Sequence, residues 1–239
     1  MSLPAVWILH RDDIAPGSEH AKALDSLLSK EEHARQLRYA SDQARHGFLL
    51  SRGLLRTVLG KISGHSPESL DFSISDSGKP ALAATPELHF SLSHSGQWIA
   101  LSVSCEAPVG IDIEQPQKPR DFLRIAHHYF HPDECALLDD ASPELLPVHF
   151  YRLWTMKEAF FKARGTGISE GLGRINLAGF HLGEGIRLDA GMADSEAPWQ
   201  FNYLMLPLAE GNHLHMALAG QDPALAEISA EQITRGLPD

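Results

Sequence analysis

Large apolar residues recur at every second position along three short runs, and this pattern constrains the fold more than any other feature. The apolar positions are Leu88, Phe90 and Leu92, then Ile99, Leu101 and Val103, and finally Val109, Ile111 and Ile113. A period of two is typical of half-buried β-strands. The turn-rich segment 93–97 separates the first two runs, which predicts a β-hairpin followed by a third strand.

Apolar residues recur at helical spacing both before and after these strands. Residues from about 17 to 60 are expected to form two helices, the second running from about Ser41 to Gly60. Another helix is expected to begin at residues 131–134, where a proline and two acids follow a histidine, and a long helix to run from about 147 to 163. Further strands are expected at residues 6–9, 199–206 and 213–219.

The order of these elements indicates the architecture. A pair of helices and a small antiparallel sheet are expected in each half of the chain. We therefore expect an α+β protein of two similar lobes, related by a pseudo-two-fold axis, with helices packed on a sheet in each lobe. Residues 1–110 would form the N-terminal lobe and residues 111–239 the C-terminal lobe.

Composition and charge exclude several classes of function. The formal net charge of −11 argues against broad nucleic-acid binding, which depends on a positive field. Only Cys105 and Cys135 are present, so we expect no disulfide framework and a reducing cytoplasm. No apolar run approaches the roughly 20 residues that span a bilayer, and the first ten residues lack the features of a signal peptide. We expect a cytoplasmic protein that binds neither nucleic acid nor membrane.

Two carboxylates lie close together on the third strand. Residues two apart in a strand point to the same face, so Asp112 and Glu114 project together while Ile111 and Ile113 enter the core. Carboxylates so close repel each other unless a cation or a base lies between them. The pair indicates either a functional site or the ordinary polar face of a half-buried strand.

The long helix carries charged residues within a wide apolar surface. Lys157 lies on the same stripe as Phe150 and Phe160, where an unpaired ammonium group would be costly. Glu158 and Lys162 are four residues apart and could form an ordinary surface ion pair. If the fold brings this helix to the strand carboxylates, three carboxylates beside two lysines would suit a hard divalent cation and a phosphate-rich ligand.

Two further segments could contact an anion. Lys79 is followed directly by Pro80, and Ser93 and His94 lie at a strand end, where hydroxyl, imidazole and backbone N–H groups can face a phosphate. An ordinary turn is the alternative for both segments. A Ser–His nucleophilic pair is disfavoured, because adjacent side chains at a strand end diverge and no orienting acid is evident.

Basic side chains also gather at two other places. Arg45, Arg52 and Arg56 share roughly one side of their helix, which is either a solvated face or an anion-facing stripe. His127 and His131 are four residues apart and could bind zinc if both were helical. Pro132 makes that helical spacing doubtful, and no third zinc ligand is evident.

Taken in sequence order, these segments resemble the 4′-phosphopantetheinyl transferase family, in the long, two-lobed form that activates carrier proteins of synthases such as surfactin synthetase. The matching segments are Gly78-Lys79-Pro80, Ser91-Leu92-Ser93-His94-Ser95, Gly110-Ile111-Asp112-Ile113-Glu114, Phe130-His131-Pro132-Asp133-Glu134 and Trp154-Thr155-Met156-Lys157-Glu158-Ala159-Phe160-Phe161-Lys162. They extend over most of the chain, and their common order is far more specific than any one of them.

The resemblance implies an activity and a set of residue roles. A member would transfer 4′-phosphopantetheine from coenzyme A to a serine of an apo acyl or peptidyl carrier protein, with Mg²⁺, and release adenosine 3′,5′-bisphosphate. The implied roles are Mg²⁺ binding by Asp112, Glu114 and Glu158, pyrophosphate contacts from Lys157 and Lys162, and nucleotide contacts from Arg45, Lys79, Pro80, Ser93 and His94. Asp112, Glu158 and Lys162 would form the catalytic centre, with Glu158 as the base for the attacking serine hydroxyl.

The chain departs from the family pattern ahead of the arginine-bearing helix. Glu31 and Glu32 stand in a segment where the family usually has bases that grip the 3′-phosphate, so further contacts to that group stay open. A catalytically silent carrier-binding or coenzyme A-binding protein of the same fold is the alternative function. The presence of all three acidic metal ligands favours the enzyme. A site at the junction of two lobes in one chain makes a monomer the expected state.

Overall fold

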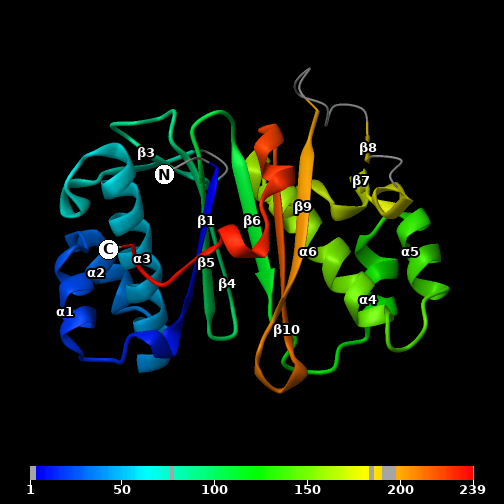
Figure 1. Cartoon of the computed structure of the whole chain (residues 1–239), viewed down its shortest axis with the longest axis horizontal. Coiled ribbons are helices and arrows are strands. Elements are labelled where there is room, and N and C mark those ends of the chain that lie inside the picture. The colour runs from blue at the N-terminus through cyan, green and yellow to red at the C-terminus, as the bar shows by residue number, and fades with distance from the viewer. Residues whose placement is uncertain (1–3, 76–77, 183–185, 190–197, 239) are drawn as a thin grey trace.

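Helices form the two outer parts of the molecule and strands lie between them (Figure 1). The computed structural model describes residues 4–75, 78–182, 186–189 and 198–238. The helices on one side are α1 (Glu19–Ser26), α2 (Lys30–Gln36) and α3 (Asp42–Ser63), and those on the other are α4 (Phe122–Tyr129), α5 (Pro132–Asp139) and α6 (Leu146–Arg164). The predicted α+β class is confirmed.

The strands form two main sheets. The first has the order β11 (Thr234–Arg235), β1 (Ala5–His10), β5 (Trp98–Ser104) and β4 (His89–Ser95), and the second has the order β6 (Val109–Glu114), β10 (His213–Gly220) and β9 (Gln200–Pro207). Small two-stranded sheets pair β2 (Phe72–Ile74) with β3 (Pro80–Leu82) and β7 (Ile175–Asn176) with β8 (Arg187–Leu188). The predicted hairpin is β4–β5, whereas the predicted third strand, β6, pairs with the distant β10.

Short 3₁₀ helices connect many of these elements. They are η1 (Arg11–Asp13), η2 (Pro67–Ser69), η3 (Ile168–Glu170), η4 (Leu172–Arg174), η5 (Ala178–Leu182), η6 (Ala209–Gly211), η7 (Pro223–Glu227) and η8 (Ala230–Gln232). No helix of the described ranges is both long and apolar enough to cross a membrane.

The N-terminal helices differ from the prediction in number and in length. Residues 17–63 form three helices instead of two, because Ser29 caps an additional helix, α2, with its side chain. Helix α3 does begin after Ser41, but it continues past Gly60 and ends at Gly64, which has the left-handed conformation that favours glycine. A Cβ atom at Gly60 would lie 2.8 Å from Pro67 Cγ, so this glycine permits close packing inside the helix.

The C-terminal elements follow the prediction closely. His131 caps α5 and completes a capping box with Glu134, as the proline and acids at the helix start indicated. Helix α6 ends at Gly165, which is left-handed, and β9 and β10 form the expected antiparallel pair.

Three apolar clusters hold these layers together. One lies between helices α1–α3 and the first sheet, and another between helices α4–α6 and the second sheet. The third joins the two sheets, because Val6 and Ile8 of β1 share it with Ile111 and Ile113 of β6. The proposed boundary at residue 110 falls inside β6, and the two-lobed, pseudo-two-fold relation stays a prediction.

Candidate active site

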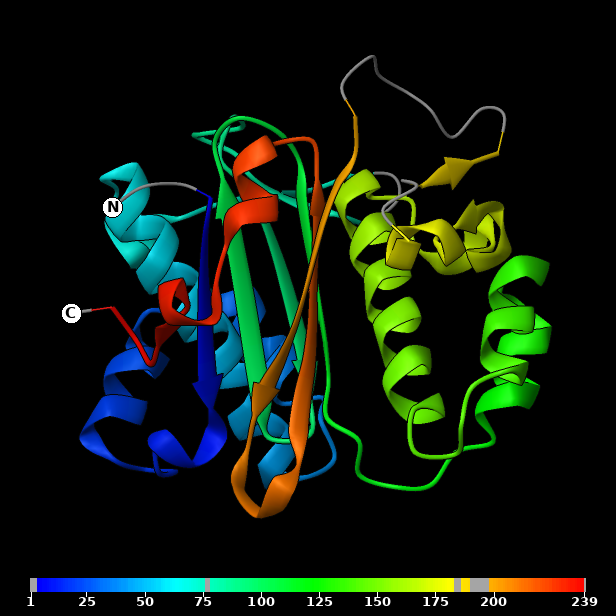
Figure 2. The same cartoon turned by 45° about the vertical axis from the view of Figure 1, so that its right-hand side comes forward.

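Helix α6 lies directly on strand β6 because Gly110 has no side chain. A Cβ atom at Gly110 would lie 1.9 Å from the Ala159 carbonyl oxygen and 2.6 Å from the Ala163 nitrogen. Ala217 and Ala219 on the neighbouring β10 are also small and fully buried. Figure 2 shows α6 running alongside the strands of the second sheet. This close approach brings the polar residues of the helix to those of the strand.

Asp112 is the centre of a buried polar cluster. Its Oδ1 accepts hydrogen bonds from Ser93 Oγ at 2.8 Å and from Lys162 Nζ at 2.6 Å. Lys162 also donates to Ser93 Oγ at 3.0 Å, and Asp112 is only 6% exposed. Residues from β4, β6 and α6 therefore meet at one point, as the sequence predicted for the strand and helix carboxylates.

Glu114 and Glu158 lie at the edge of this cluster and are half-buried. Burial, followed by the charge of Asp112, raises the pKa of Glu158 to about 6, while Lys162 opposes the shift. Burial also raises the pKa of Glu114, against a hydrogen bond of 2.8 Å from Ser95 Oγ to Glu114 Oε2. Glu158 makes no hydrogen bond or ion pair to any described residue. Among the described residues, Lys162 and, at Glu114, Arg120 are the cations that act on these three carboxylates, so negative charge is in excess.

The donor set of this cluster suits a magnesium ion. Mg²⁺ prefers carboxylate oxygens and binds through few protein ligands together with water and substrate phosphates. The excess of negative charge at Asp112, Glu114 and Glu158 matches a divalent cation. As they stand, no three acidic, histidine or cysteine side chains of the described ranges form a complete ligand set, and Lys162 neutralises Asp112 instead.

The two histidines considered for zinc have other partners. His127 Nε2 lies 3.0 Å from Asp139 Oδ1, and His131 accepts a hydrogen bond from the Asp133 nitrogen as the cap of α5. His131 therefore lies outside a helix, and the helical spacing that a zinc pair needs is absent from this pair.

Lys157 does not face the carboxylate cluster, which contradicts its predicted pyrophosphate contact. Its side chain is fully buried, and Nζ lies 2.8 Å from Glu134 Oε2. Nζ also donates to the carbonyl oxygens of Leu172 at 2.8 Å and Ile175 at 2.5 Å. The apolar stripe did indicate that this ammonium needs a partner, but the partner is a buried glutamate of α5 and not a ligand.

A cavity of about 300 Å³ adjoins Lys162, between helix α3, strand β4 and the C-terminal end of helix α6. Lys79, Pro80, Leu92 and Phe161 are among its lining residues. Lys79 Nζ donates to the Ala163 carbonyl oxygen at 2.6 Å, and burial lowers the pKa of Lys79 to about 8. The structure thus places Lys79 and Pro80 beside Lys162, whereas Ser93 is held inside the Asp112 cluster.

A second cavity, of about 310 Å³, brings His94 and Arg52, which the sequence had singled out, together with Arg11 and Arg35, to which it had given no role. Arg11, Arg35 and Arg52 line it together with His94, and none of the carboxylates in the described part of the chain does so. Partial burial, followed by the charges of Arg11 and Lys162, lowers the pKa of His94. Arg45 is not among the residues lining this cavity, and it pairs with Asp42 at 2.6 Å.

Arg11 reaches the second cavity through the space that a side chain at residue 47 would fill. A Cβ atom at Gly47 would lie 2.7 Å from the Arg11 guanidinium carbon. Arg11 Nε is buried and has no hydrogen-bond partner among the described residues. Arg11 of η1 and Gly47 of α3 are far apart in the sequence, so their contact leaves no local pattern. This explains why the sequence did not indicate Arg11.

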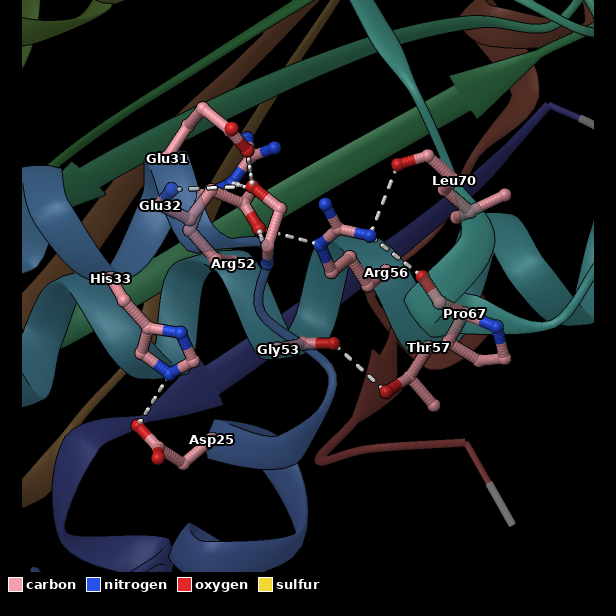
Figure 3. Close-up of polar contacts among 11 residues, drawn as sticks. Asp25, Glu31, Glu32, His33, Arg52, Gly53, Arg56, Thr57, Pro67 and Leu70 are labelled. Carbon is pink, nitrogen blue, oxygen red and sulfur yellow. Dashed lines mark hydrogen bonds and ion pairs between the residues drawn. The ribbon is translucent and has the colours of Figure 1, made fainter.

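The unexpected acid of α2 organises the arginines of α3 (Figure 3). Glu32 Oε1 accepts from Arg52 Nε at 2.5 Å, and Glu32 Oε2 accepts from Arg56 Nε at 2.7 Å. Arg56 is 2% exposed and also donates to the carbonyl oxygens of Pro67 and Leu70. Arg56 therefore has a structural role, and neither a solvated face nor an anion-facing stripe describes it. Arg52, held by the same acid, lines both cavities.

Comparisons with known proteins show which family the chain resembles. Residues 108–219 match the family model described as the 4′-phosphopantetheinyl transferase superfamily. Residues 14–106 match a second family model, described as "4′-phosphopantetheinyl transferase, N-terminal". The chain is 37% identical over 144 residues to a 4′-phosphopantetheinyl transferase of Bacillus subtilis, covering 60% of this chain and 63% of the relative. It is 36% identical over 200 residues to 4′-phosphopantetheinyl transferase psf-1 of Bacillus pumilus, covering 84% and 81%.

A third relative indicates the type within the family. It is 4′-phosphopantetheinyl transferase Sfp of Bacillus subtilis strain 168, which is 34% identical over 158 residues, covering 61% of this chain and 69% of the relative. The first relative is spanned over a little less than two thirds of its length, and the other two over more than two thirds. The chain therefore belongs to the 4′-phosphopantetheinyl transferase family of enzymes, in its Sfp-like type.

Proposed function

We propose that the protein transfers 4′-phosphopantetheine from coenzyme A to a serine of an apo acyl or peptidyl carrier protein, with Mg²⁺, and releases adenosine 3′,5′-bisphosphate. One observation carries the proposal. Asp112, Glu114 and Glu158 form an acidic cluster in which Lys162 pairs with Asp112, directly beside a cavity that shares Arg52 with a basic one. A metal ion and a polyphosphate would complete this charge pattern.

The two cavities together suit the nucleotide end of coenzyme A. They share Arg52 and Leu92 as walls, so one extended ligand could occupy both. We assign the 3′-phosphate to the cavity of Arg11, Arg35 and His94, because three arginines line it and no carboxylate does so among the described residues. The adenosine and pyrophosphate would then run past Lys79 and Pro80 toward Lys162, so that the anionic groups of the ligand follow the cations of the protein.

Asp112, Glu114 and Glu158 are the residues that would hold Mg²⁺. When bound, the ion supplies positive charge against the pyrophosphate oxygens. Lys162 supplies a second positive charge at the same place, on the leaving phosphate, where negative charge develops. Lys162 is 31% exposed at its side chain, so its ammonium can turn from Asp112 toward a ligand in the adjoining cavity.

Glu158 is positioned to accept the proton of the carrier serine. The serine oxygen attacks the phosphorus that bears the pantetheine arm, and the bond from this phosphorus to the bridging oxygen breaks. The electron pair leaves with adenosine 3′,5′-bisphosphate, and the hydroxyl proton passes to Glu158. In the metal-free site burial raises the pKa of Glu158 to about 6, and the carboxylate is still largely ionised at neutral pH, as a proton acceptor must be.

The carrier protein must approach a chain whose net charge is −11. Around the second cavity Arg11 and Arg35, with the neighbouring Arg38, outnumber the nearby acid Glu31 and form a local exception to that charge. We propose that the protein acts as a cytoplasmic monomer, with the site at the junction of two lobes.

A mass measurement tests the function directly. The protein is incubated with coenzyme A, Mg²⁺ and each of several apo acyl and peptidyl carrier proteins, and the carriers are weighed by mass spectrometry. We expect one phosphopantetheine group on at least one carrier and none when Mg²⁺ is chelated. Coenzyme A binding without any added mass would favour the catalytically silent alternative.

A further inference from the structure

Strands β4 and β6 lie side by side but belong to different sheets. Within the described ranges, no backbone-to-backbone ladder joins them. Three serine hydroxyls of β4 make the connection instead. Ser91 Oγ accepts from the Ile111 nitrogen at 3.1 Å, Ser93 Oγ from the Ile113 nitrogen at 3.3 Å, and Ser95 Oγ from the Gln115 nitrogen at 3.1 Å.

The regular spacing explains how the three bonds can form together. Residues 91, 93 and 95 point to one side of β4, and the N–H groups of residues 111, 113 and 115 point to one edge of β6. Buried backbone N–H groups need an acceptor, and each hydroxyl supplies one. The serines thus replace a strand ladder at the line where the two sheets meet.

Two of the three hydroxyls carry a second bond to the candidate metal site. Ser93 donates to Asp112 Oδ1 and Ser95 donates to Glu114 Oε2, each at 2.8 Å. A hydroxyl has one proton to donate and two lone pairs to accept. Each serine oxygen accepts the backbone N–H through one lone pair, so the hydroxyl proton of the same serine stays free to bond the carboxylate. Ser91 makes only the backbone bond among these contacts.

We propose that Ser93 and Ser95 are positioning residues. Each orients one carboxylate, Asp112 or Glu114, and does so only while β4 and β6 are in contact. This inference rests on the proposed function. Metal ligands are commonly oriented by hydrogen bonds from residues that do not touch the metal. Here the same oxygen atom holds the β6 backbone and the adjoining carboxylate, so a gap between the sheets would release both.

Ser91 offers a control for this proposal, and because it also lines the first cavity, Mg²⁺ affinities are compared with coenzyme A at saturation. Ser91→Ala removes one bond between β4 and β6 but no bond to a carboxylate, whereas Ser95→Ala removes one of each. Ser95 is half-buried, so Ser95→Ala disturbs packing less than a change at Ser93, which is 5% exposed. The comparison separates a role at the metal site from a role in holding the sheets together.

The test is a calorimetric titration of Mg²⁺ into the whole protein, without carrier and with coenzyme A at a concentration that saturates each variant. Ser93→Ala and Ser95→Ala should weaken Mg²⁺ binding about 10-fold, in line with other residues that orient metal ligands. Ser91→Ala should leave Mg²⁺ affinity within about twofold of the wild type, although its thermal unfolding midpoint falls as well. Ser95→Thr, which keeps a hydroxyl, should recover most of the lost affinity.

Equal Mg²⁺ affinities for Ser91→Ala and Ser95→Ala would overturn the proposal. If Ser93→Ala does not fold, Ser95→Ala alone decides. A wild-type protein that binds no Mg²⁺ and modifies no carrier would instead remove the proposed function. Wild-type transfer with unchanged Mg²⁺ affinity in Ser95→Ala would remove only this inference.

Discussion

Gly110 of β6 and Ala159 of α6 are in such close contact that a Cβ atom on Gly110 would lie 1.9 Å from the Ala159 carbonyl oxygen. The obstacle is backbone, so it cannot rotate away as a side chain could. Every polar group that α6 contributes to the candidate site depends on this contact, because Glu158 and Lys162 flank Ala159 on the helix.

Gly110→Ala should therefore damage the site more than its single methyl group suggests. The helix must move away from β6, and a displacement of about 1 Å at a catalytic group can lower the rate about 100-fold. We expect a lower thermal unfolding midpoint and a loss of transfer of that size in the fraction that stays folded. Gly173→Ala is the control, since its Cβ would meet only ordinary contacts of 3.4 Å or more.

Glu158→Gln should separate chemistry from binding. Glutamine keeps the size of the side chain but cannot accept the serine proton, and a general base is typically worth about 100-fold or more in rate. Because Glu158 would also hold Mg²⁺, turnover is measured at saturating Mg²⁺; we expect it to fall by at least that factor, while the dissociation constant for coenzyme A in metal-free buffer changes less than about threefold. Glu68→Gln, at an exposed glutamate of η2, should change neither quantity. Equal losses in turnover and binding would count against the proton-accepting role.

Much of the fold was predictable because local patterns determine it. The period of two at residues 88–103 predicted β4 and β5, and the glycine after residue 164 predicted the end of α6. The pairing of β6 with β10 was not predictable in this way, since about 100 residues separate the two strands. Gly60 was taken for a helix end because a glycine allows both a stop and a close contact, and only Pro67 in the folded protein shows which applies.

The candidate site was predictable where its residues share a local pattern. Asp112 and Glu114 alternate with core residues of one strand, and Glu158 and Lys162 are one helical turn apart, so the sequence indicated both pairs. Lys157 was misassigned because its partner, Glu134, lies on another helix.

The Lys157–Glu134 ion pair should matter for stability and not for phosphate binding. Removing one member leaves a buried, unpaired charge, so Lys157→Met should lower the free energy of unfolding by about 3–5 kcal/mol. Adding Glu134→Gln should recover part of that loss, because the second charge is then gone as well. Denaturant unfolding of the single and double variants measures the effect. A stable Lys157→Met protein with weakened coenzyme A binding would restore the pyrophosphate role.

Lys79 should make nucleotide binding and stability depend on pH above neutrality. Its folded pKa of about 8 lies below the ordinary value of 10.5, so the folded protein binds fewer protons than the unfolded chain between those values. Stability from this group therefore rises with pH across pH 8–10.5, while the cation that would contact the ligand is lost above about pH 8.

Binding of adenosine 3′,5′-bisphosphate should thus weaken from pH 7.5 to 9 in metal-free buffer. Lys79→Met should bind more weakly at pH 7.5 and show a flatter profile. His94 does not contribute to the change between pH 7.5 and 9, because its pKa is lowered from 6.5 and so lies below that range. An unchanged pH profile in Lys79→Met would show that another group is responsible.

Arg11 and Gly47 should act as one unit in binding the 3′-phosphate. Arg11→Ala removes a cation from the second cavity, and a hydrogen bond to a charged group is worth about 1.5–3 kcal/mol, which corresponds to at least a 10-fold loss of affinity. Gly47→Ala should cause a similar loss, because a Cβ there would displace the Arg11 guanidinium, 2.7 Å away. If displacement is the cause, the double variant should bind no more weakly than either single variant.

Calorimetry with coenzyme A and with dephospho-coenzyme A, which lacks the 3′-phosphate, locates the effect. Both single variants should lose affinity for coenzyme A and keep their affinity for dephospho-coenzyme A, so that the preference for the 3′-phosphate narrows. Arg45→Ala is the matched control, since Arg45 pairs with Asp42 and does not line the cavity. Additive losses in the double variant would mean that Gly47→Ala does not act through Arg11. A narrowed preference in Arg45→Ala, with none in Arg11→Ala, would mean that Arg45 and not Arg11 contacts the phosphate.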